Sequence, residues 1–241
     1  MYTDLVNKTI LVTGAGQGIG NALCKRLAEN GTNVIAITRS AEHLVNLKAE
    51  CSSIMSIAVD LRDWGRTREC LADVPMLDGL VNNAAVAIIK PFEELSQHDI
   101  DETFDVNIKS VFNVTQVLSS KLKDSSSVVM VSSLAASRSF AGHSAYSATK
   151  AAVDSLTQSL ALEWGSRKIR VNSVNPTVVL TKMGRDNWSD PKKSEPLLNH
   201  IPLHRFCEVP EVVDSIAYLL SNKSSFVNGH HLSLEGGYSV S

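Results

Sequence analysis

Residues 8–31 read KTILVTGAGQGIGNALCKRLAENG and indicate the architecture of this 241-residue chain more clearly than any other stretch. Residues 8–13 are a short β-rich run, and residues 21–31 have helical apolar spacing that ends in a glycine. The glycines between them follow G-x-x-x-G-x-G with an extra Gly16; they do not fit G-x-G-x-x-G, because Ile19 stands at its sixth position. A strand, a glycine turn and a helix direct backbone N–H groups and a helix dipole toward a phosphate. The stretch therefore favours a dinucleotide site over an ordinary tight turn.

Strand-like runs alternate with helix-length segments along the rest of the chain, without a repeat or a linker. This alternation predicts one α/β domain over residues 1–241, a Rossmann-like, doubly wound parallel sheet of about seven strands with helices on both faces. We expect a cofactor half at about 1–130 and a catalytic and substrate-loop half at about 131–241. The strand candidates are TILVT (9–13), NVIAIT (33–38), SIAVD (56–60), GLVNNA (79–84), SVVMVS (127–132), IRVNSV (169–174) and HHLSL (230–234).

Residues 177–207 are the one irregular region, rich in Pro, Asn, Asp and Lys, and they follow the sixth predicted strand. A long connection at this place predicts a mobile substrate lid that carries a short helix. The pair Lys192-Lys193 is most simply part of a solvated loop.

Charge and cysteine content narrow the class of protein. The net charge is -2, the predicted pI is about 6.4 and no basic run occurs, so nothing favours nucleic acid as a partner.

The start of the chain lacks a signal-like apolar segment and no run reaches membrane-spanning length, so we expect no membrane association and a cytoplasmic protein. His200 and His204 have i, i+4 spacing, but Pro202 separates them and no carboxylates cluster nearby, so we expect no metal. Four scattered cysteines predict free thiols in a reducing compartment: Cys24, Cys51, Cys70 and Cys207.

The segment SLAASRSFAGHSAYSATK, residues 133–150, places Ser133 thirteen residues before Tyr146 and Lys150 four residues after it. On a helix, this spacing puts the phenol and the ammonium on one face. Lowering the pKa of a tyrosine from about 10 to about 7 needs roughly 4 kcal/mol of preference for the phenolate. One cation typically supplies ~1 to 3 units, so Lys150 needs a second positive charge, which an oxidised nicotinamide ring provides.

An isolated Y-x-x-x-K pair is more often part of an ordinary amphipathic helix. Here the context favours function, because SSVVMVSS just before Ser133 reads as a buried strand that ends in hydroxyls. In open α/β sheets, ligands bind beyond the carboxyl ends of the strands. Ser133 is therefore expected to project into a binding site.

These segments together resemble the short-chain dehydrogenase/reductase family over nearly the whole chain. The chain has the motifs of that family in the same order and with the same spacing. They are TGAGQGIG, Asp60, NNAA (82–85), Asn107 within DVNIKS, Ser133, Tyr146, Lys150 and PTVVLT (176–181). Further segments resemble the branch of the family that reduces L-xylulose and α-dicarbonyls. They are WGRT, NNAAVAIIKPF, VNPTVVLTKMG, NWSDP and IPLHRF.

The resemblance implies a role for each site residue. Tyr146 gives a proton to the carbonyl oxygen as hydride arrives from the nicotinamide, Ser133 hydrogen-bonds that oxygen, and Lys150 holds the nicotinamide ribose and lowers the pKa of the tyrosine. Asn107 completes a tetrad by anchoring a water that links the lysine to solvent. Where Ala85 stands, the family more often has Gly. The implied cofactor residues are Gly14, Gln17, Gly18, Ile19, Gly20, Arg39, Ser40, Asp60, Leu61, Asn83, Ala84, Ala85, Tyr146, Lys150, Pro176, Val179 and Thr181.

The end of the second predicted strand favours NADP(H) over NAD(H). NAD-selective folds place an Asp or Glu there to accept hydrogen bonds from the adenosine ribose. This chain has Thr38-Arg39-Ser40 and no acid before Glu42, so Arg39 offers planar donors and a full charge to a 2′-phosphate. Many NADP-preferring relatives also carry a basic residue in the glycine loop, where this chain has Gln17, so the margin over NAD(H) is expected to be smaller.

The substrate is expected to be a small carbonyl compound or sugar. The resemblance implies α-dicarbonyls and L-xylulose, which is reduced to xylitol, and His143 and Trp188 as pocket residues; the alternatives are a helix cap for the histidine and a packing anchor for the tryptophan. Leu134 and Phe140 make the site look more apolar than a sugar requires, which favours diketones. The implied substrate residues are Ser133, Phe140, His143, Tyr146 and Trp188.

Two other classes of function remain open. One is a reductase of 3-oxoacyl thioesters or a secondary-alcohol dehydrogenase, for which Lys182, Arg185, Lys192 and Lys193 would form a basic entry patch. The other is a non-catalytic dinucleotide-binding scaffold. It is disfavoured because degenerate scaffolds usually lose the Ser, Tyr or Lys that this chain retains.

Two long predicted helices, after Asn107 and over residues 146–164, are apolar on more than one side, and a second apolar face needs a partner. The family resemblance supplies two two-fold axes and thus a homotetramer, with a dimer as the alternative. The other possibility is that the extra apolar positions pack within a monomer. The C-terminal tail, residues 239–241, is expected to vary or to reach the pocket of a neighbouring subunit. The apolar positions are Val111, Val114, Val117, Leu118, Val153, Leu156, Leu160 and Leu162.

Overall fold

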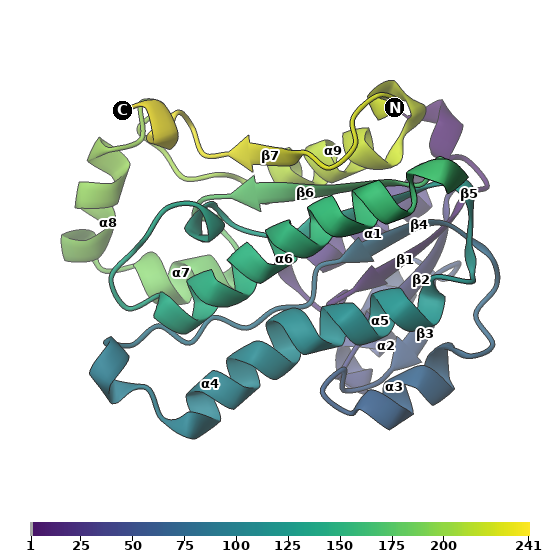
Figure 1. Cartoon of the computed structure of the whole chain (residues 1–241), viewed down its shortest axis with the longest axis horizontal. Coiled ribbons are helices and arrows are strands. Elements are labelled where there is room, and N and C mark those ends of the chain that lie inside the picture. The colour runs from purple at the N-terminus through teal and green to yellow at the C-terminus, as the bar shows by residue number, and fades with distance from the viewer. Residues whose placement is uncertain (1) are drawn as a thin grey trace.

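Seven parallel strands form one sheet in the order β3-β2-β1-β4-β5-β6-β7 in the computed structural model, which describes residues 2–241 (Figure 1). The prediction of a doubly wound parallel sheet is confirmed, and each predicted run lies in or overlaps a strand. The order reverses between β1 and β4, where a doubly wound sheet binds its ligand. The strands are β1 (Thr9–Thr13), β2 (Asn33–Thr38), β3 (Met55–Ala58), β4 (Leu77–Asn82), β5 (Leu122–Val131), β6 (Arg170–Pro176) and β7 (His231–Leu234).

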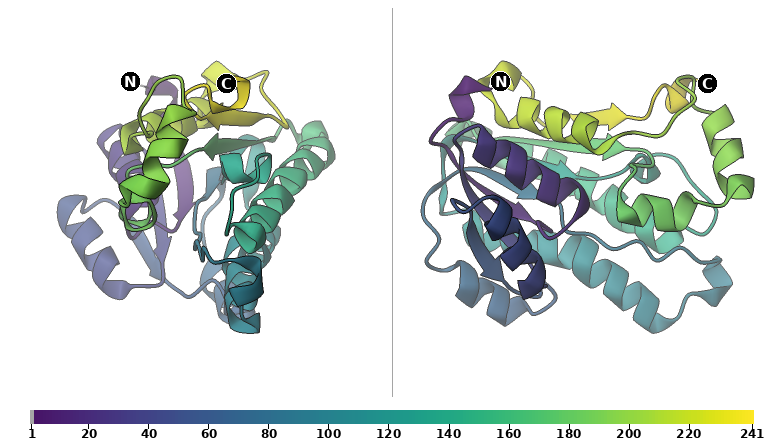
Figure 2. Two further views of the ribbon diagram at one scale, coloured as in Figure 1. Left: turned by 90° about the vertical axis from the view of Figure 1, so that its left-hand side faces the viewer. Right: turned by 180° about the vertical axis from the view of Figure 1, so that it is seen from behind.

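Helices cover both faces of the sheet. Figure 1 shows α4, α5 and α6 in front of the sheet, and the reverse view in Figure 2 shows α1 and α2 across the other face. The helices are α1 (Gly18–Glu29), α2 (Ala41–Glu50), α3 (Trp64–Leu71), α4 (Gln97–Phe104), α5 (Ser110–Leu118), α6 (Ser144–Glu163), α7 (Lys182–Trp188), α8 (Pro191–Asn199) and α9 (Val209–Leu220).

Each face of the sheet has its own apolar core, because successive strand residues point to opposite sides. Ile10 and Val12 of β1 belong to the core under α1 and α9, whereas Leu11 belongs to the core under α5 and α6. All three side chains are buried. A strand buried on both faces reads as a continuous apolar run, which is why the sequence predicted β1 so clearly.

The prediction of a second apolar face on α5 and α6 is wrong for most of the positions on which it was based. Five of those side chains are buried in the core of their own chain, because these helices pack closely on the sheet. Leu162, by contrast, is 86% exposed. The buried five are Val111, Val114, Leu118, Val153 and Leu156.

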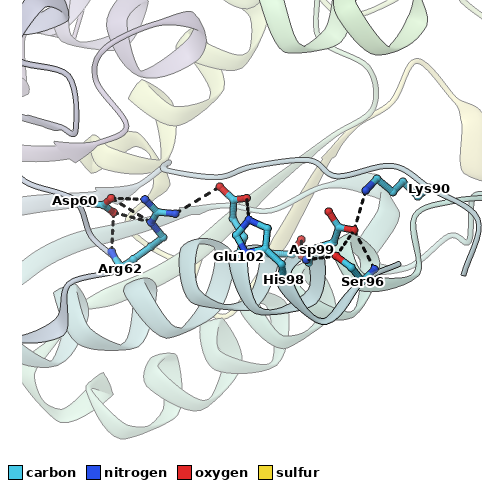
Figure 3. A network of polar contacts seen from close by, with 8 residues as sticks. Asp60, Arg62, Lys90, Ser96, His98, Asp99 and Glu102 are labelled. Carbon is cyan, nitrogen blue, oxygen red and sulfur yellow. Dashed lines mark hydrogen bonds and ion pairs between the residues drawn. The ribbon is translucent and has the colours of Figure 1, made fainter. Parts of the chain in front are cut away.

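A π-helical turn, Asp105–Lys109, joins α4 to α5, so the chain is helical without a break from α4 to the end of α5. The start of α4 is fixed by a capping box, in which the Ser96 hydroxyl accepts from the Asp99 N–H and the Asp99 carboxylate accepts from the Ser96 N–H (Figure 3). Lys90 also donates to Asp99, and these hydrogen bonds hold the pKa of that carboxyl well below its usual range. The π turn places Asn107 on the inner side of the helix, where it is buried.

The irregular region after β6 contains two helices, α7 and α8, where the sequence predicted one short helix. Thr181 caps α7 by accepting from the Gly184 N–H, and Asp190 caps α8 by accepting from the Lys192 N–H. Lys192 and Lys193 therefore lie in the first turn of α8, not in a loop as predicted. Figure 1 shows both helices beyond the carboxyl ends of β6 and β7. Across residues 2–241, no helix has the length and apolar character needed to cross a membrane.

Candidate active site

A cavity of about 400 Å³ lies at the carboxyl ends of the strands and extends from the glycine loop to α7. Of the predicted site residues, only Gly20 and Asn107 do not line it. The lining residues are Gly14, Gln17, Gly18, Ile19, Arg39, Ser40, Asp60, Leu61, Asn83, Ala84, Ala85, Ser133, Phe140, His143, Tyr146, Lys150, Pro176, Val179, Thr181 and Trp188. Sequence reasoning missed other lining residues, among them Thr38, His43, Val86, Ile89, Val131, Met183, Asn187 and Leu197.

The glycine loop has a shape that only glycine permits at two positions. Gly14 has a φ of +66°, and a Cβ there would lie 2.8 Å from the Ala84 Cα. Gly20, predicted as a cofactor residue, is buried inside α1 and packs on the loop. A Cβ on it would lie 2.4 Å from the Gly14 carbonyl oxygen. The loop thus brings the N-terminus of α1 to the cavity, as binding of a pyrophosphate requires.

Thr13 and Asn83 tie the loop to β4 at the reversal of strand order. The Thr13 Oγ1 accepts from the backbone N–H groups of Asn83 and Ala84, at 3.0 and 3.1 Å. The Asn83 side chain donates to the carbonyl oxygens of Thr13 and Gly14, at 3.0 and 3.2 Å. Asn83 therefore shapes the loop as well as lining the cavity. The role of Thr13 was missed because a strand-end threonine carries no distinctive sequence signal.

The end of the cavity near β2 is lined by Arg39, Ser40, His43 and Asp60. Arg39 is exposed and contributes to lowering the pKa of Asp60. The main cause of that lowering is Arg62, whose guanidinium donates to both carboxylate oxygens, the shortest contact being 2.6 Å (Figure 3). Because Arg62 is paired with Asp60, Arg39 is the cation that faces this end of the cavity. The N–H groups of its guanidinium suit a phosphate. Arg62 was missed because its role depends on the turn after β3.

Ser133, Tyr146 and Lys150 meet at the other end of the cavity, beside the end of β5. Ser133 follows that strand and accepts a hydrogen bond from the Ala135 N–H at 3.1 Å. The Lys150 Nζ lies 5.6 Å from the centroid of the Tyr146 ring and donates to the Val131 carbonyl oxygen at 2.8 Å. Burial lowers the pKa of Lys150 to about 8, opposed by the charge of Asp154. The helical spacing of the phenol and the ammonium therefore places both in the site.

The pKa of Tyr146 departs from its ordinary value in the direction opposite to the predicted one. Burial raises it and outweighs the hydrogen bond with Ser133, which lowers it. The lysine alone does not overcome the desolvation of the phenolate, as the need for a second positive charge implied. A phenol with a raised pKa is protonated near neutral pH and can serve as a proton donor.

Asn107 contacts the cavity wall and lies behind it. Its Oδ1 accepts from the Val86 N–H at 2.8 Å, and its Nδ2 donates to the Val86 carbonyl oxygen at 2.9 Å and to the Thr149 Oγ1 at 3.2 Å. These are the contacts of a helix-interior amide that satisfies nearby backbone groups. Asn107 joins the loop after β4 to the first turns of α6.

The substrate end of the cavity is mainly apolar and aromatic. The ring of His143 lies 5.6 Å from that of Phe140 and 6.2 Å from those of Tyr146 and Trp188. His143 stands at the start of α6 but its side chain does not cap the helix; its Nδ1 lies 2.8 Å from the Ala141 carbonyl oxygen, and burial lowers its pKa. Trp188 also packs on Phe206, so it is both a cavity residue and a packing anchor. Leu134, Ile89 and Leu197 complete the apolar lining.

The C-terminal tail packs on its own chain. The ring of Tyr238 lies 5.7 Å from Phe140 and 5.3 Å from His200, and the Ser241 hydroxyl donates to the His200 carbonyl oxygen at 2.7 Å. The tail thereby supports Phe140 from behind. Between Tyr2 and Ser241, no group of three or more His, Cys, Asp or Glu side chains is arranged to hold a metal ion.

Comparison with known proteins gives consistent matches over nearly the full length. A family model described as enoyl-(acyl carrier protein) reductase matches residues 14–239. The chain is 45% identical over 243 residues to the L-xylulose reductase of Mesocricetus auratus, covering 100% of both chains. It is 45% identical to the carbonyl reductase [NADPH] 2 of Sus scrofa, covering 96% of both. A solved structure from Beutenbergia cavernae, described as an NAD(P)-dependent gluconate 5-dehydrogenase with bound NADP at low occupancy, superimposes with a TM-score of 0.92, at 28% identity and 100% coverage of both chains.

Proposed function

The chain is an oxidoreductase of the short-chain dehydrogenase/reductase family, and we propose that it reduces small carbonyl compounds, α-dicarbonyls and L-xylulose, with NADPH. The observation that carries the proposal is one cavity with Ser133, Tyr146 and Lys150 at one end and the glycine loop at the other. The names of the similar proteins, an L-xylulose reductase and an NADPH carbonyl reductase, support the same reaction.

Each residue of the site has its own role in the proposed reaction. The Ser133 and Tyr146 hydroxyls hydrogen-bond the substrate carbonyl oxygen, and Tyr146 gives it a proton. The Lys150 ammonium holds the nicotinamide ribose and adds a positive charge that stabilises the phenolate left by proton transfer. Asn107, held against the backbone of Val86, anchors the path by which a proton returns to Lys150. When bound, the nucleotide supplies the hydride.

The chain favours NADP(H) over NAD(H) because Arg39 faces the adenosine end of the cavity without a competing free carboxylate. Asp60, the carboxylate of that end, is engaged by Arg62. Ser40, which lines the same end, stands at the N-terminus of α2 and adds a hydroxyl. Gly14, Gly18, Ile19 and the N-terminus of α1 would hold the pyrophosphate, and Pro176, Val179 and Thr181, which line the same cavity, would contact the nicotinamide.

The apolar lining favours diketones over pentuloses. Leu134 and Phe140 offer no hydrogen bond to a sugar, and a polyhydroxylated substrate needs matched partners. His143, with its Nδ1 directed at a backbone carbonyl, adds a polar group to the Ser133 and Tyr146 hydroxyls at this end of the cavity. A basic entry patch for a carrier-bound thioester is weakly supported, because Arg185 donates to the Leu180 carbonyl oxygen and Lys182 pairs with Asp186 at 3.9 Å.

A screen of NADPH consumption against three substrate classes tests the proposal. We expect turnover with 2,3-diketones and with L-xylulose, a higher kcat/KM for the diketones, and little or none with acetoacetyl thioesters. The physical reason is the match between an apolar pocket and a substrate with few hydroxyls. The fastest turnover on the thioester would select the alternative function, and no turnover on any class would select the scaffold.

We further propose that the protein is a homotetramer of closed symmetry. Phe112 on α5 and Leu162 on α6 are 49% and 86% exposed, and apolar side chains of this size on the outer sides of adjacent helices suit a contact with a second copy. Light scattering should give a mass four times the 26.1 kDa of the chain at micromolar concentration. A stable monomer at that concentration would refute the assembly, and a mass of two chains would select the dimer.

The four cysteines are free thiols, the state that a reducing compartment maintains, which supports a cytoplasmic location. Cys24 is buried, and burial raises its pKa to about 12, so its thiol is unreactive.

A further inference from the structure

A polar cluster lies between α6 and the sheet, one helical turn beyond Lys150. It consists of Asp154 and Gln158 on α6, Ser173 and Asn175 on β6, and His231 on β7, and we call it the Asp154 cluster. Strands of a parallel sheet are normally apolar on both faces. Ser173 and Asn175 are nonetheless almost fully buried, so their hydroxyl and amide require hydrogen-bond partners in the protein.

Both side chains lie against the carboxylate of Asp154. The Asn175 Nδ2 donates to the Asp154 Oδ2 at 2.7 Å. The Ser173 Oγ lies 3.2 Å from the Asp154 Oδ1 and 2.6 Å from the Asn175 Oδ1, so its single proton makes the shorter hydrogen bond to the Asn175 amide. The His231 Nδ1 lies 3.6 Å from the same Oδ1. The Asp154 carboxylate therefore lies at the centre of the cluster, behind the site.

The outer end of the cluster has a defined proton arrangement. The Gln158 Nε2 can only donate, so the His231 Nε2, 3.1 Å away, accepts, and the neutral ring carries its proton on Nδ1. That Nδ1 lies 2.8 Å from the Ser173 Oγ. A directed chain of hydrogen bonds thus runs from the surface amide of Gln158 through His231 and Ser173 to Asn175, whose amide donates to Asp154.

The inner end of the cluster reaches two residues of the active site. Lys150 and Asp154 are four residues apart on α6, so they lie on one face of the helix. Asn175, besides holding Asp154, donates to the backbone carbonyl of Ser133 at 3.3 Å. One carboxylate therefore lies one helical turn from the lysine and is connected through Asn175 to the backbone of the serine.

We propose that Asp154 is a positioning residue for the reaction: its carboxylate keeps the Lys150 ammonium charged and, through Asn175, fixes the backbone that carries Ser133. The inference rests on the proposed function for the role of Lys150. It goes beyond that function because Asp154 does not line the cavity and acts only through its neighbours.

The balance of charges around Lys150 supports the proposal. Burial lowers the pKa of Lys150 and the charge of Asp154 raises it, so Asp154 is what limits the drop. The titratable groups that face this pair are Tyr146 on α6 and His231 on β7. From β5 and β6 come only the Val131 carbonyl, Ser173 and Asn175, which do not titrate. Removing the carboxylate, or neutralising it with a fixed cation, should therefore allow Lys150 to lose its proton at lower pH.

The test compares two ways of cancelling the charge of Asp154. Asp154→Asn removes the charge with nearly the same shape, and His231→Lys places a fixed cation beside the carboxylate from the partly exposed edge strand. Both should move the high-pH fall of kcat/KM for 2,3-butanedione to lower pH, by about one unit. Asp154→Glu should restore much of the wild-type profile. Glu163→Gln removes an exposed carboxylate at the end of the same helix and should leave the profile unchanged.

The same displacement is expected in the pH dependence of the NADPH dissociation constant, measured by nucleotide fluorescence without a carbonyl compound, because a charged lysine makes the stronger hydrogen bond to a ribose. This readout separates a failure of the inference from a failure of the proposed substrate. Profiles of Asp154→Asn and His231→Lys that superpose on wild type would overturn the inference. If Asp154→Asn does not fold, His231→Lys decides alone, since it leaves every buried residue of the cluster in place.

Discussion

Tyr146→Phe is expected to lower turnover of 2,3-butanedione by about 100- to 10,000-fold, the usual contribution of a positioned proton donor. The substitution removes one hydroxyl from a ring packed beside His143 and Lys150, so the shape of the site changes little. Affinity for NADPH, measured by fluorescence, should stay within about threefold of wild type, because little contact area is lost. The loss should therefore fall on kcat and not on cofactor binding.

Tyr218→Phe is the matched control, since it removes a phenol hydroxyl from α9, outside the cavity. Turnover by this variant should equal wild type. If Tyr146→Phe retained wild-type turnover, the assignment of the proton donor would fail. A large loss of NADPH affinity in the same variant would instead indicate that the ring holds the nucleotide.

Arg39→Ala should weaken NADPH by about 10- to 100-fold, as expected for hydrogen bonds of about 1.5–3 kcal/mol to a charged group. NADH, which has no 2′-phosphate, should lose less than about threefold. The difference arises because Arg39 is exposed and provides the cation at the adenosine end, while Arg62 is engaged by Asp60. Titrations of both nucleotides by fluorescence measure the two losses directly.

Arg26→Ala is the control for a general effect of charge, because Arg26 is an exposed arginine paired with Asp214 at 3.0 Å and lies outside the cavity. It should change neither affinity. Equal losses for NADPH and NADH in Arg39→Ala would contradict a phosphate contact and leave Arg39 as a surface residue of the turn after β2.

The sequence predicted those features that depend on local patterns. Nearly continuous apolar runs predicted β1, β2 and the second half of β5, since a strand covered on both faces has no polar side. The glycines at 14 and 18 predicted a tight loop between β1 and α1, and both adopt positive φ there. The four-residue spacing of Tyr146 and Lys150 predicted that both would face one cavity, because helical geometry follows from spacing alone.

Features that depend on contacts distant in sequence could not be predicted in this way. The direction of the pKa shift of Tyr146 depends on how deeply the folded chain buries it, and no sequence pattern reports that depth. The Asp154 cluster joins positions 154, 175 and 231, and each alone reads as an ordinary polar residue in a helix or strand. Gly20 resembled a cofactor residue, but only the folded loop reveals that it packs on Gly14.

Composition misled the prediction in two places. Residues 177–207 resembled a loop with one short helix because Pro, Asn and Asp are frequent, yet Thr181 and Asp190 are helix caps and each begins a helix. Apolar residues around α5 and α6 suggested a second exposed face, but Val111 and Leu156 are buried because both helices pack deeply on the sheet. Amphipathicity indicates that a face is covered and not what covers it.

The initial rate of NADPH oxidation by the purified protein, followed at the nicotinamide absorbance after addition of 2,3-butanedione, tests the central claim most directly. Wild type should oxidise NADPH in step with formation of the hydroxyketone, and Tyr146→Phe in the same experiment should leave the absorbance nearly constant while still binding the nucleotide. NADPH that binds to wild type but is not oxidised in the presence of a diketone or of L-xylulose would contradict the assignment of a carbonyl reductase.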